Sequence, residues 1–160
     1  MFQKVNVSRL LASIILCQLA GVIGSVFTAS SLESWYFLLE KPAFTPPSWV
    51  FFPFWTTLYT LMGISLYLVW EKGLQRREVK KGVFLFGLQL GLNTLWSLLF
   101  FGLRSPYYAF FEILILWVAI LLMMIQFWKI SKPASLLLIP YIFWVSLAAL
   151  LNYQIWILNP

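Results

Sequence analysis

The stretch GVFLFGLQLGLNTLWSLLFF, residues 82–101, decides the fold of this chain. It carries no charged side chain, and its length matches the roughly 20 helical residues that cross a hydrocarbon layer of about 30 Å. Four further apolar runs of similar length lie on either side of it, at residues 10–27, 49–70, 107–128 and 134–158. The sequence therefore predicts an all-α integral membrane protein, a bundle of five transmembrane helices that forms a single domain over residues 1–160.

The composition supports this class and excludes several chemistries. The 160 residues are 62% hydrophobic and 10% charged, whereas a soluble domain is about half apolar and a quarter charged. The chain has no histidine, no aspartate and one cysteine. These absences from the sequence exclude a histidine-based triad, a cysteine/histidine zinc site and a disulfide within one chain. We expect no metal and no cofactor.

The basic residues indicate the orientation. With five spans, the amino terminus shares one side of the membrane with the second and fourth connections. All basic residues except Lys41 and Arg104 fall on that side: Lys4, Arg9, Lys72, Arg76, Arg77, Lys80, Lys81, Lys129 and Lys132. In a bacterial inner membrane this places the amino terminus in the cytoplasm and the carboxyl end outside. The net charge of +6 thus reports topology, and no nucleic-acid partner is expected. A cleaved signal peptide is the competing interpretation of the start, although Phe27 fits a cleavage site poorly.

The connection over residues 28–48 differs from the others because it is long and rich in aromatic side chains. Trp35 and Tyr36 lie within it, and Pro42, Pro46 and Pro47 stiffen it. A long loop with side chains of the buried type usually packs as a lid or a binding element. A loop that only rests in the membrane interface is the alternative.

The span at residues 82–101 has two different faces. Gln89, Asn93 and Trp96 recur at helical spacing on one face, and Gly87 and Gly91 lie on the opposite one. Because unpaired amides in lipid are costly, the first face is expected to point into the bundle. The glycine face would accept a second helix, which predicts a homodimer. In the alternative interpretation the two amides only hold helices together.

Two other spans carry matching stripes. Trp55 and Tyr59 lie along the second span, and Trp144, Ala148 and Asn152 along the fifth. Such stripes are often core, but these lie beneath the long loop at the depth of the third-span amides. A cavity lined by indoles, a phenol and amides suits a flat, mostly apolar ligand with one or two polar groups.

One acid and one proline stand out inside the spans. Glu112 is a candidate for a ligand role because acids within the membrane are costly to keep there. Pairing with Arg104 is the alternative. Pro140 should kink the fifth span.

Taken together, these residues resemble the translocator protein or tryptophan-rich sensory protein family (TspO/MBR), which includes the peripheral benzodiazepine receptor. The resemblance covers nearly the whole chain in order. Its motifs are Trp35-Tyr36, Lys41-Pro42, Thr45-Pro46-Pro47-Ser48-Trp49-Val50-Phe51, Trp55-Thr56-Thr57-Leu58-Tyr59, Met62-Gly63, Asn93 with Trp96, Phe100-Phe101-Gly102, Pro140-Tyr141 with Trp144, and Leu151-Asn152-Tyr153 with Trp156.

The resemblance implies a five-helix bundle, often dimeric, that binds porphyrins such as protoporphyrin IX, sterols in some members, and synthetic isoquinoline carboxamide or benzodiazepine ligands. It also implies a pocket under the long loop, and its small residues for dimerisation correspond to Gly87 and Gly91. The implied pocket residues are Trp35, Tyr36, Pro46, Trp49, Trp55, Tyr59, Gln89, Asn93, Trp96, Trp144 and Ala148. No basic residue follows Tyr153, so the sterol-recognition pattern of the family is incomplete.

Three functions are consistent with this sequence. The first is a membrane receptor or sensor for which a porphyrin is the ligand. The second is light-dependent porphyrin degradation, in which Trp55 and Trp144 would pass electrons to the photoexcited ring. The third is transport of tetrapyrroles or lipids. Transport ranks last because five helices show no paired halves of the kind that secondary transporters use.

Overall fold

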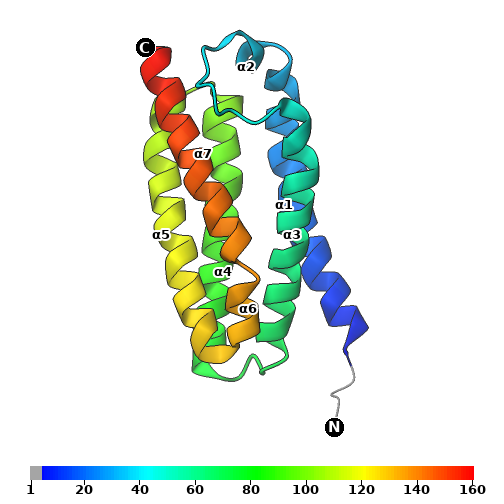
Figure 1. The fold of residues 1–160 in the computed structure, drawn as a ribbon. Coiled ribbons are helices and arrows are strands. Elements are labelled where there is room, and N and C mark those ends of the chain that lie inside the picture. Colours follow the sequence, from blue (N-terminus) through cyan, green and yellow to red (C-terminus); the bar gives the residue numbers. More distant parts are fainter. Residues whose placement is uncertain (1–4) are drawn as a thin grey trace.

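The computed structural model describes residues 5–160, so Lys4 lies outside the described residues. Five segments are long and apolar enough to cross a membrane. They are α1 (Val7–Leu32), α3 (Ser48–Trp70), α4 (Arg77–Ser97) continued by the π-helix η1 (Leu98–Gly102), α5 (Pro106–Ile130), and α6 (Lys132–Leu136) followed by α7 (Ile139–Leu158). The segments run up and down side by side, with the short helix α2 (Trp35–Leu38) and the carboxyl end opposite the amino terminus (Figure 1). The predicted all-α five-helix membrane bundle is confirmed.

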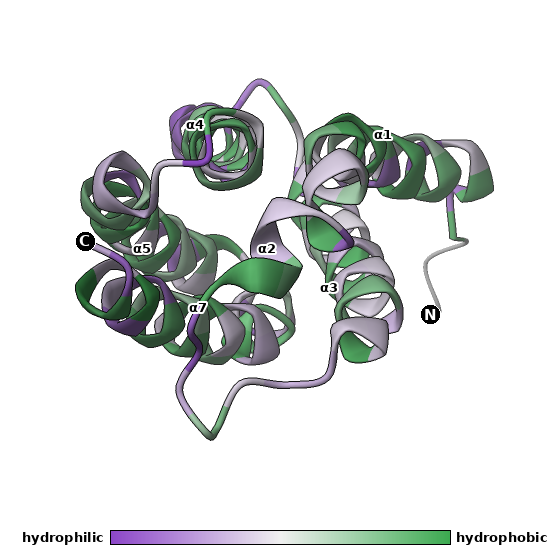
Figure 2. Cartoon of the chain, turned by 90° about the horizontal axis from the view of Figure 1, so that it is seen from above, coloured by the Kyte–Doolittle hydropathy of each residue, from purple (hydrophilic) through white to green (hydrophobic). Residues whose placement is uncertain are grey.

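The helices surround the bundle axis in the order α1, α4, α5, α7 and α3, and α2 lies across the centre at one end (Figure 2). The α4 helix packs on α5, α5 packs on α7, and α1 packs on both α3 and α4. Large apolar side chains such as Leu11, Ile15 and Leu19 are exposed on the outer surface. This outer surface fits a lipid environment, where exposed apolar groups need no partner.

The first helix continues past Phe27, where the sequence predicted its end, to Leu32. The polar residues that suggested a loop find partners that keep the helix intact. Thr28 Oγ1 donates to Gly24 O at 3.1 Å, and Ser31 Oγ donates to Phe101 O at 2.7 Å. Because each hydroxyl is satisfied by a carbonyl, the chain has no reason to leave the helix there. The connection between the first two spans is thus shorter than residues 28–48.

The fifth span is broken rather than kinked. The α6 helix ends at Leu136, and Pro140 lies in the first turn of α7, where the missing N–H of proline costs nothing. Near the break, Ser65 Oγ donates to Ala134 O at 2.7 Å, so α3 satisfies a carbonyl there. The predicted kink is corrected to a break between two helices.

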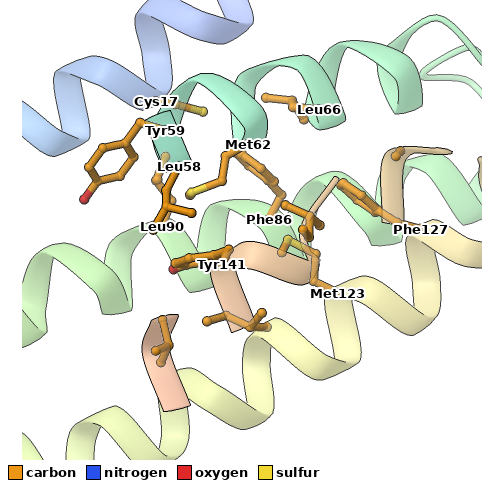
Figure 3. Close-up of a cluster of buried hydrophobic side chains, with 14 of the residues drawn as sticks. Cys17, Leu58, Tyr59, Met62, Leu66, Phe86, Leu90, Met123, Phe127 and Tyr141 are labelled. Carbon is orange, nitrogen blue, oxygen red and sulfur yellow. The ribbon is translucent and has the colours of Figure 1, made fainter. Parts of the chain in front are cut away.

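Buried apolar side chains fill the half of the bundle nearer the amino terminus, around Met62, Phe86, Met123 and Phe127 (Figure 3). The rings of Phe86 and Phe127 are parallel with centroids 6.2 Å apart. The candidate site lies in the other half of the bundle, nearer α2.

Candidate functional site

A cavity of about 370 Å³, here called the chamber, lies among α1, α3, α4 and α7 beneath α2. No charged side chain of residues 5–160 lines it. Its lining comes from α1 (Gln18, Gly21, Val22, Gly24, Ser25, Thr28, Ala29 and Leu32), from α3 (Ser48, Phe51, Phe52, Trp55, Thr56 and Tyr59), and from α4, η1 and α7 (Trp96, Ser97, Phe101, Trp144 and Ala148). Predicted pocket residues Trp55, Tyr59, Trp96, Trp144 and Ala148 are thus brought together.

Trp144 is the centre of an aromatic wall. It stacks on Phe54 at 4.2 Å between centroids and meets Trp55 edge to face at 6.4 Å. Trp55 in turn stacks on Tyr59 at 5.6 Å. Rings in these arrangements attract one another beyond their burial. The wall is therefore held together by contacts between its own rings.

Trp96 is held in place by a hydrogen bond to Asn152, which is itself bonded to α5. Its Nε1 donates to Asn152 Oδ1 at 3.0 Å, and Asn152 Nδ2 donates to Pro106 O at 2.7 Å. Its ring stacks on Phe100, which belongs to η1. Wider turns of this kind are frequent at functional sites because they re-aim side chains. Here η1 brings Phe101 to the chamber while Phe100 supports Trp96.

Gln89 and Asn93 form a polar floor under the aromatic wall instead of lining the chamber. Tyr59 Oη donates to Asn93 Oδ1 at 2.6 Å, and Asn93 Nδ2 donates to Tyr141 Oη at 3.0 Å. Tyr141 Oη donates to Gln89 Oε1 at 2.8 Å. This placement matches the alternative in which the amides hold helices together. The network also fixes the Tyr59 ring against the chamber.

The wall that α1 contributes to the chamber was not predicted from the sequence. Exposed side chains of α1 and α3, among them Ser25 and Thr56, line the chamber, so it opens sideways between these helices. Near this opening, Gln18 Nε2 donates to Thr56 O at 3.1 Å and to Thr60 Oγ1 at 3.0 Å. One sequence pattern could have predicted this wall. Small or polar residues recur at positions 18, 21, 25 and 28, which share one helical face.

The segment between α1 and α3, here called the lid, is held down by its aromatic residues. Trp35 packs edge on against Phe100, and the buried Tyr36 packs against Phe51 and Phe101. Burial raises the pKa of the Tyr36 phenol to about 12, so the side chain stays neutral at physiological pH. The two predicted pocket residues of α2 are therefore part of a roof packed on η1 rather than of the chamber lining.

Two polar residues, Lys41 and Asn159, hold the lid by hydrogen bonds. Lys41 Nζ donates to the carbonyls of Tyr36 at 2.7 Å, Leu39 at 2.8 Å and Phe37 at 3.3 Å. Partial burial lowers the pKa of the Lys41 ammonium from its ordinary value. At the carboxyl end, Asn159 Oδ1 accepts from the backbone N–H of Glu40, and its Nδ2 donates to the carbonyl of the same residue, both at 3.0 Å. Asn159, which caps the carboxyl end of α7, thus attaches the lid to the bundle.

The remaining predicted residues lie elsewhere. Pro46 is half-buried between α2 and α3 and does not line the chamber, and Trp49 is 75% exposed. Gly87 and Gly91 lie on the outer face of α4, where an added Cβ meets no atom within 4 Å. Glu112 is buried on α5, and neither carboxyl oxygen has a hydrogen-bond partner among the described residues. The structure contains no pairing of Glu112 with Arg104 in its described part.

Comparison with known proteins finds one family model and several relatives that match most of the chain. The TspO/MBR family model matches residues 13–157. Over 96% of its length the chain is 47% identical to the tryptophan-rich protein TspO of Archaeoglobus fulgidus, and the match covers 99% of that protein. It is 36% identical to the translocator protein of Homo sapiens, with 84% of this chain and 80% of that one covered. It is 32% identical to the tryptophan-rich sensory protein of Cereibacter sphaeroides, with 79% and 78% covered.

Proposed function

The chain belongs to the TspO/MBR family, and from this premise we propose that it is a membrane receptor or sensor that binds porphyrins such as protoporphyrin IX and related flat apolar ligands in the chamber. The observation that carries the proposal is the aromatic wall around Trp144 in an uncharged cavity. The cavity volume of about 370 Å³ falls within the range of roughly 300–1,000 Å³ that small-molecule sites occupy.

We infer the orientation of such a ligand from the residues that line the chamber. Its apolar ring system would stack on the indoles of Trp55, Trp96 and Trp144, whose faces offer a large contact area. Its polar edge would point toward the side opening, where hydroxyls of Ser25 and Thr28 line the chamber. A charged group in the interior would be left unpaired, since no ionic partner lines that space in the described chain.

Titration of protoporphyrin IX against tryptophan fluorescence tests the proposal. We expect saturable quenching, and we expect Trp144→Ala to weaken binding about tenfold, because a lost aromatic contact of about 1.4 kcal/mol corresponds to that factor. The control is Trp128→Phe, since Trp128 lies on α5 outside the chamber. Identical affinities of wild type and Trp144→Ala, or no quenching at micromolar ligand, would contradict the proposal.

Light-dependent porphyrin degradation is a second candidate, supported by the neighbouring indoles of Trp55 and Trp144 at 6.4 Å. Each could donate an electron to a photoexcited ring bound against it. Under illumination we then expect the absorbance of bound porphyrin to fall several-fold faster than that of free porphyrin, and Trp144→Phe to slow the loss. Bleaching of the bound porphyrin at the rate of the free compound rejects this candidate and leaves binding intact.

The charged and small residues of the outer surface suggest an orientation in the membrane and an oligomeric state. We propose that in a bacterial inner membrane the amino terminus faces the cytoplasm and the lid faces outward, because the basic residues gather at the amino-terminal end. We also propose a homodimer through α4. Its outer face presents the smooth strip of Gly87 and Gly91 between the exposed side chains of Phe84 and Leu95, and small residues let two helices approach closely in lipid.

A further inference from the structure

Beside the chamber lies a second hollow, here called the vestibule, of about 520 Å³ and lined by Leu32, Glu33, Phe37, Ser48 and Trp49. Leu32 and Ser48 line the chamber as well, so the two spaces adjoin. The vestibule differs from the chamber in one respect that matters for recognition, because one of its lining residues, Glu33, is acidic. The proposed porphyrin site makes no use of this acid.

Glu33 has no ionic partner in the described part of the chain. Within residues 5–160 the one ion pair joins Arg9 to Glu71, at the amino-terminal end of the bundle. The cation on the lid, Lys41, directs its ammonium group to three backbone carbonyls and to the Tyr36 ring, 4.8 Å away. The negative charge at the vestibule is therefore left for a ligand.

The end of α1 adds to that negative potential. Glu33 is the residue that caps the carboxyl end of α1, and the last turn of α1 contains no basic side chain. The carbonyls at a helix carboxyl end carry about half a negative charge, which favours a cation and disfavours an acid. A cation bound in the vestibule would interact favourably with both the carboxylate and the helix end.

Two exposed aromatic residues line the vestibule together with the acid. Phe37 is 74% exposed and Trp49 is 75% exposed. Anchoring at the membrane interface explains exposed aromatic rings but not an unpaired acid in the same hollow. Aromatic faces combined with a negative charge form the environment that holds ammonium groups.

We propose that the vestibule binds the alkylammonium group of an amphiphile whose flat apolar body lies in the chamber. This inference rests on the proposed function, because it assumes that the chamber holds the apolar body. It assigns a preference within that ligand class. Of two ligands with the same body, the one whose group in the vestibule is cationic binds more tightly, since an anionic group there would face Glu33 and the end of α1. The carboxylates of a porphyrin would instead point toward the side opening near Ser25 and Thr28.

Three probes with one flat body test the preference: 4-(1-pyrenyl)butyl-trimethylammonium, 4-(1-pyrenyl)butanol and 4-(1-pyrenyl)butanoate. Binding to the full chain in a non-ionic detergent is followed by energy transfer from tryptophan to pyrene. We expect the ammonium probe to bind about fivefold more tightly than the alcohol. In Glu33→Gln this advantage should fall to about twofold or less, because only the end of α1 and the two rings still favour the cation, while the affinity for the alcohol stays unchanged. Glu40→Gln, the same change on the same lid but outside the vestibule, should leave both affinities unaltered.

Each other outcome overturns a defined part of the argument. If the ammonium probe binds equally to wild type, Glu33→Gln and Glu40→Gln, the vestibule proposal is wrong and the chamber stands. If all three probes lose affinity together in Glu33→Gln, the acid acts on the shape of the lid and the proposal is again wrong. If none of the probes binds wild type, the chamber itself fails as the site of flat apolar ligands.

Discussion

Gly63→Ala is expected to lower the free energy of unfolding by about 3 kcal/mol, the upper end of the usual cost of overpacking. An added Cβ at Gly63 would lie 2.5 Å from the Cα and 2.9 Å from the backbone nitrogen of Ile14. Backbone atoms cannot rotate away as a side chain can, so α1 and α3 must separate. Thermal unfolding in detergent measures the effect, and a fall in melting temperature of about 10 °C corresponds to it.

Gly91→Ala is the matched control for this prediction, measured on the monomeric chain in detergent because Gly91 also belongs to the proposed dimer face. It also replaces a glycine in a membrane helix, but an added Cβ there meets no atom within 4 Å. Alanine has the higher helix propensity, so the melting temperature of the single chain should stay the same or rise slightly. Equal losses in both variants would mean that close approach of α1 and α3 is not the cause. The separation of these helices should also widen the side opening, so Gly63→Ala should alter ligand affinity while Gly91→Ala should not.

Most of the fold could be predicted because the membrane restricts the choice of structure. A backbone in lipid must satisfy its polar groups internally. An apolar run of the length of residues 82–101 does so by forming a transmembrane helix. Exact helix ends were less predictable. The end of α1 at Leu32 depends on a hydrogen bond from Ser31 to Phe101, a residue distant in the sequence. The break before Pro140 depends on Ser65 in the same way, and no local pattern contains these partners.

The candidate site could be predicted only on one side. Aromatic residues at helical spacing indicated the wall formed by Trp55, Tyr59 and Trp144, because large rings dominate packing wherever they lie. The opposite wall is formed by small residues of α1 such as Gly21 and Gly24, whose contribution is the space that they leave. In a sequence, a small residue indicates close helix packing and an open chamber equally well. Gly21 takes part in both. It packs closely on Tyr59, where an added Cβ would lie 2.6 Å from the ring, and it lines the chamber.

Asn93→Ala is expected to lower the free energy of unfolding by about 2–3 kcal/mol. Asn93 accepts from Tyr59 and donates to Tyr141. The substitution therefore leaves the buried Tyr59 hydroxyl without its acceptor, whereas the Tyr141 hydroxyl keeps its bond to Gln89. An unsatisfied buried group costs roughly 1–3 kcal/mol, and the lost hydrogen bond to Tyr141 adds to this, since hydrogen bonds between membrane helices contribute about 0.6 kcal/mol on average with a maximum of about 1.7. Ligand affinity should also fall several-fold, because the Tyr59 ring at the chamber loses its anchor. Equilibrium unfolding and the porphyrin titration measure the two effects.

Thr94→Ala is the control, because the hydroxyl of Thr94 donates only to Leu90 O of its own helix, and its loss should change stability by less than about 0.5 kcal/mol. The decisive measurement is a double-mutant cycle of Asn93→Ala with Tyr59→Phe. If the floor acts as a network, the second substitution adds little once the first has been made, and the coupling reaches about 1 kcal/mol. Additive losses would mean that Asn93 only fills space between α4 and α3. The Tyr59 ring would then be held by its packing against neighbours such as Trp55 and Gly21, and the ligand affinity of Asn93→Ala would match that of wild type.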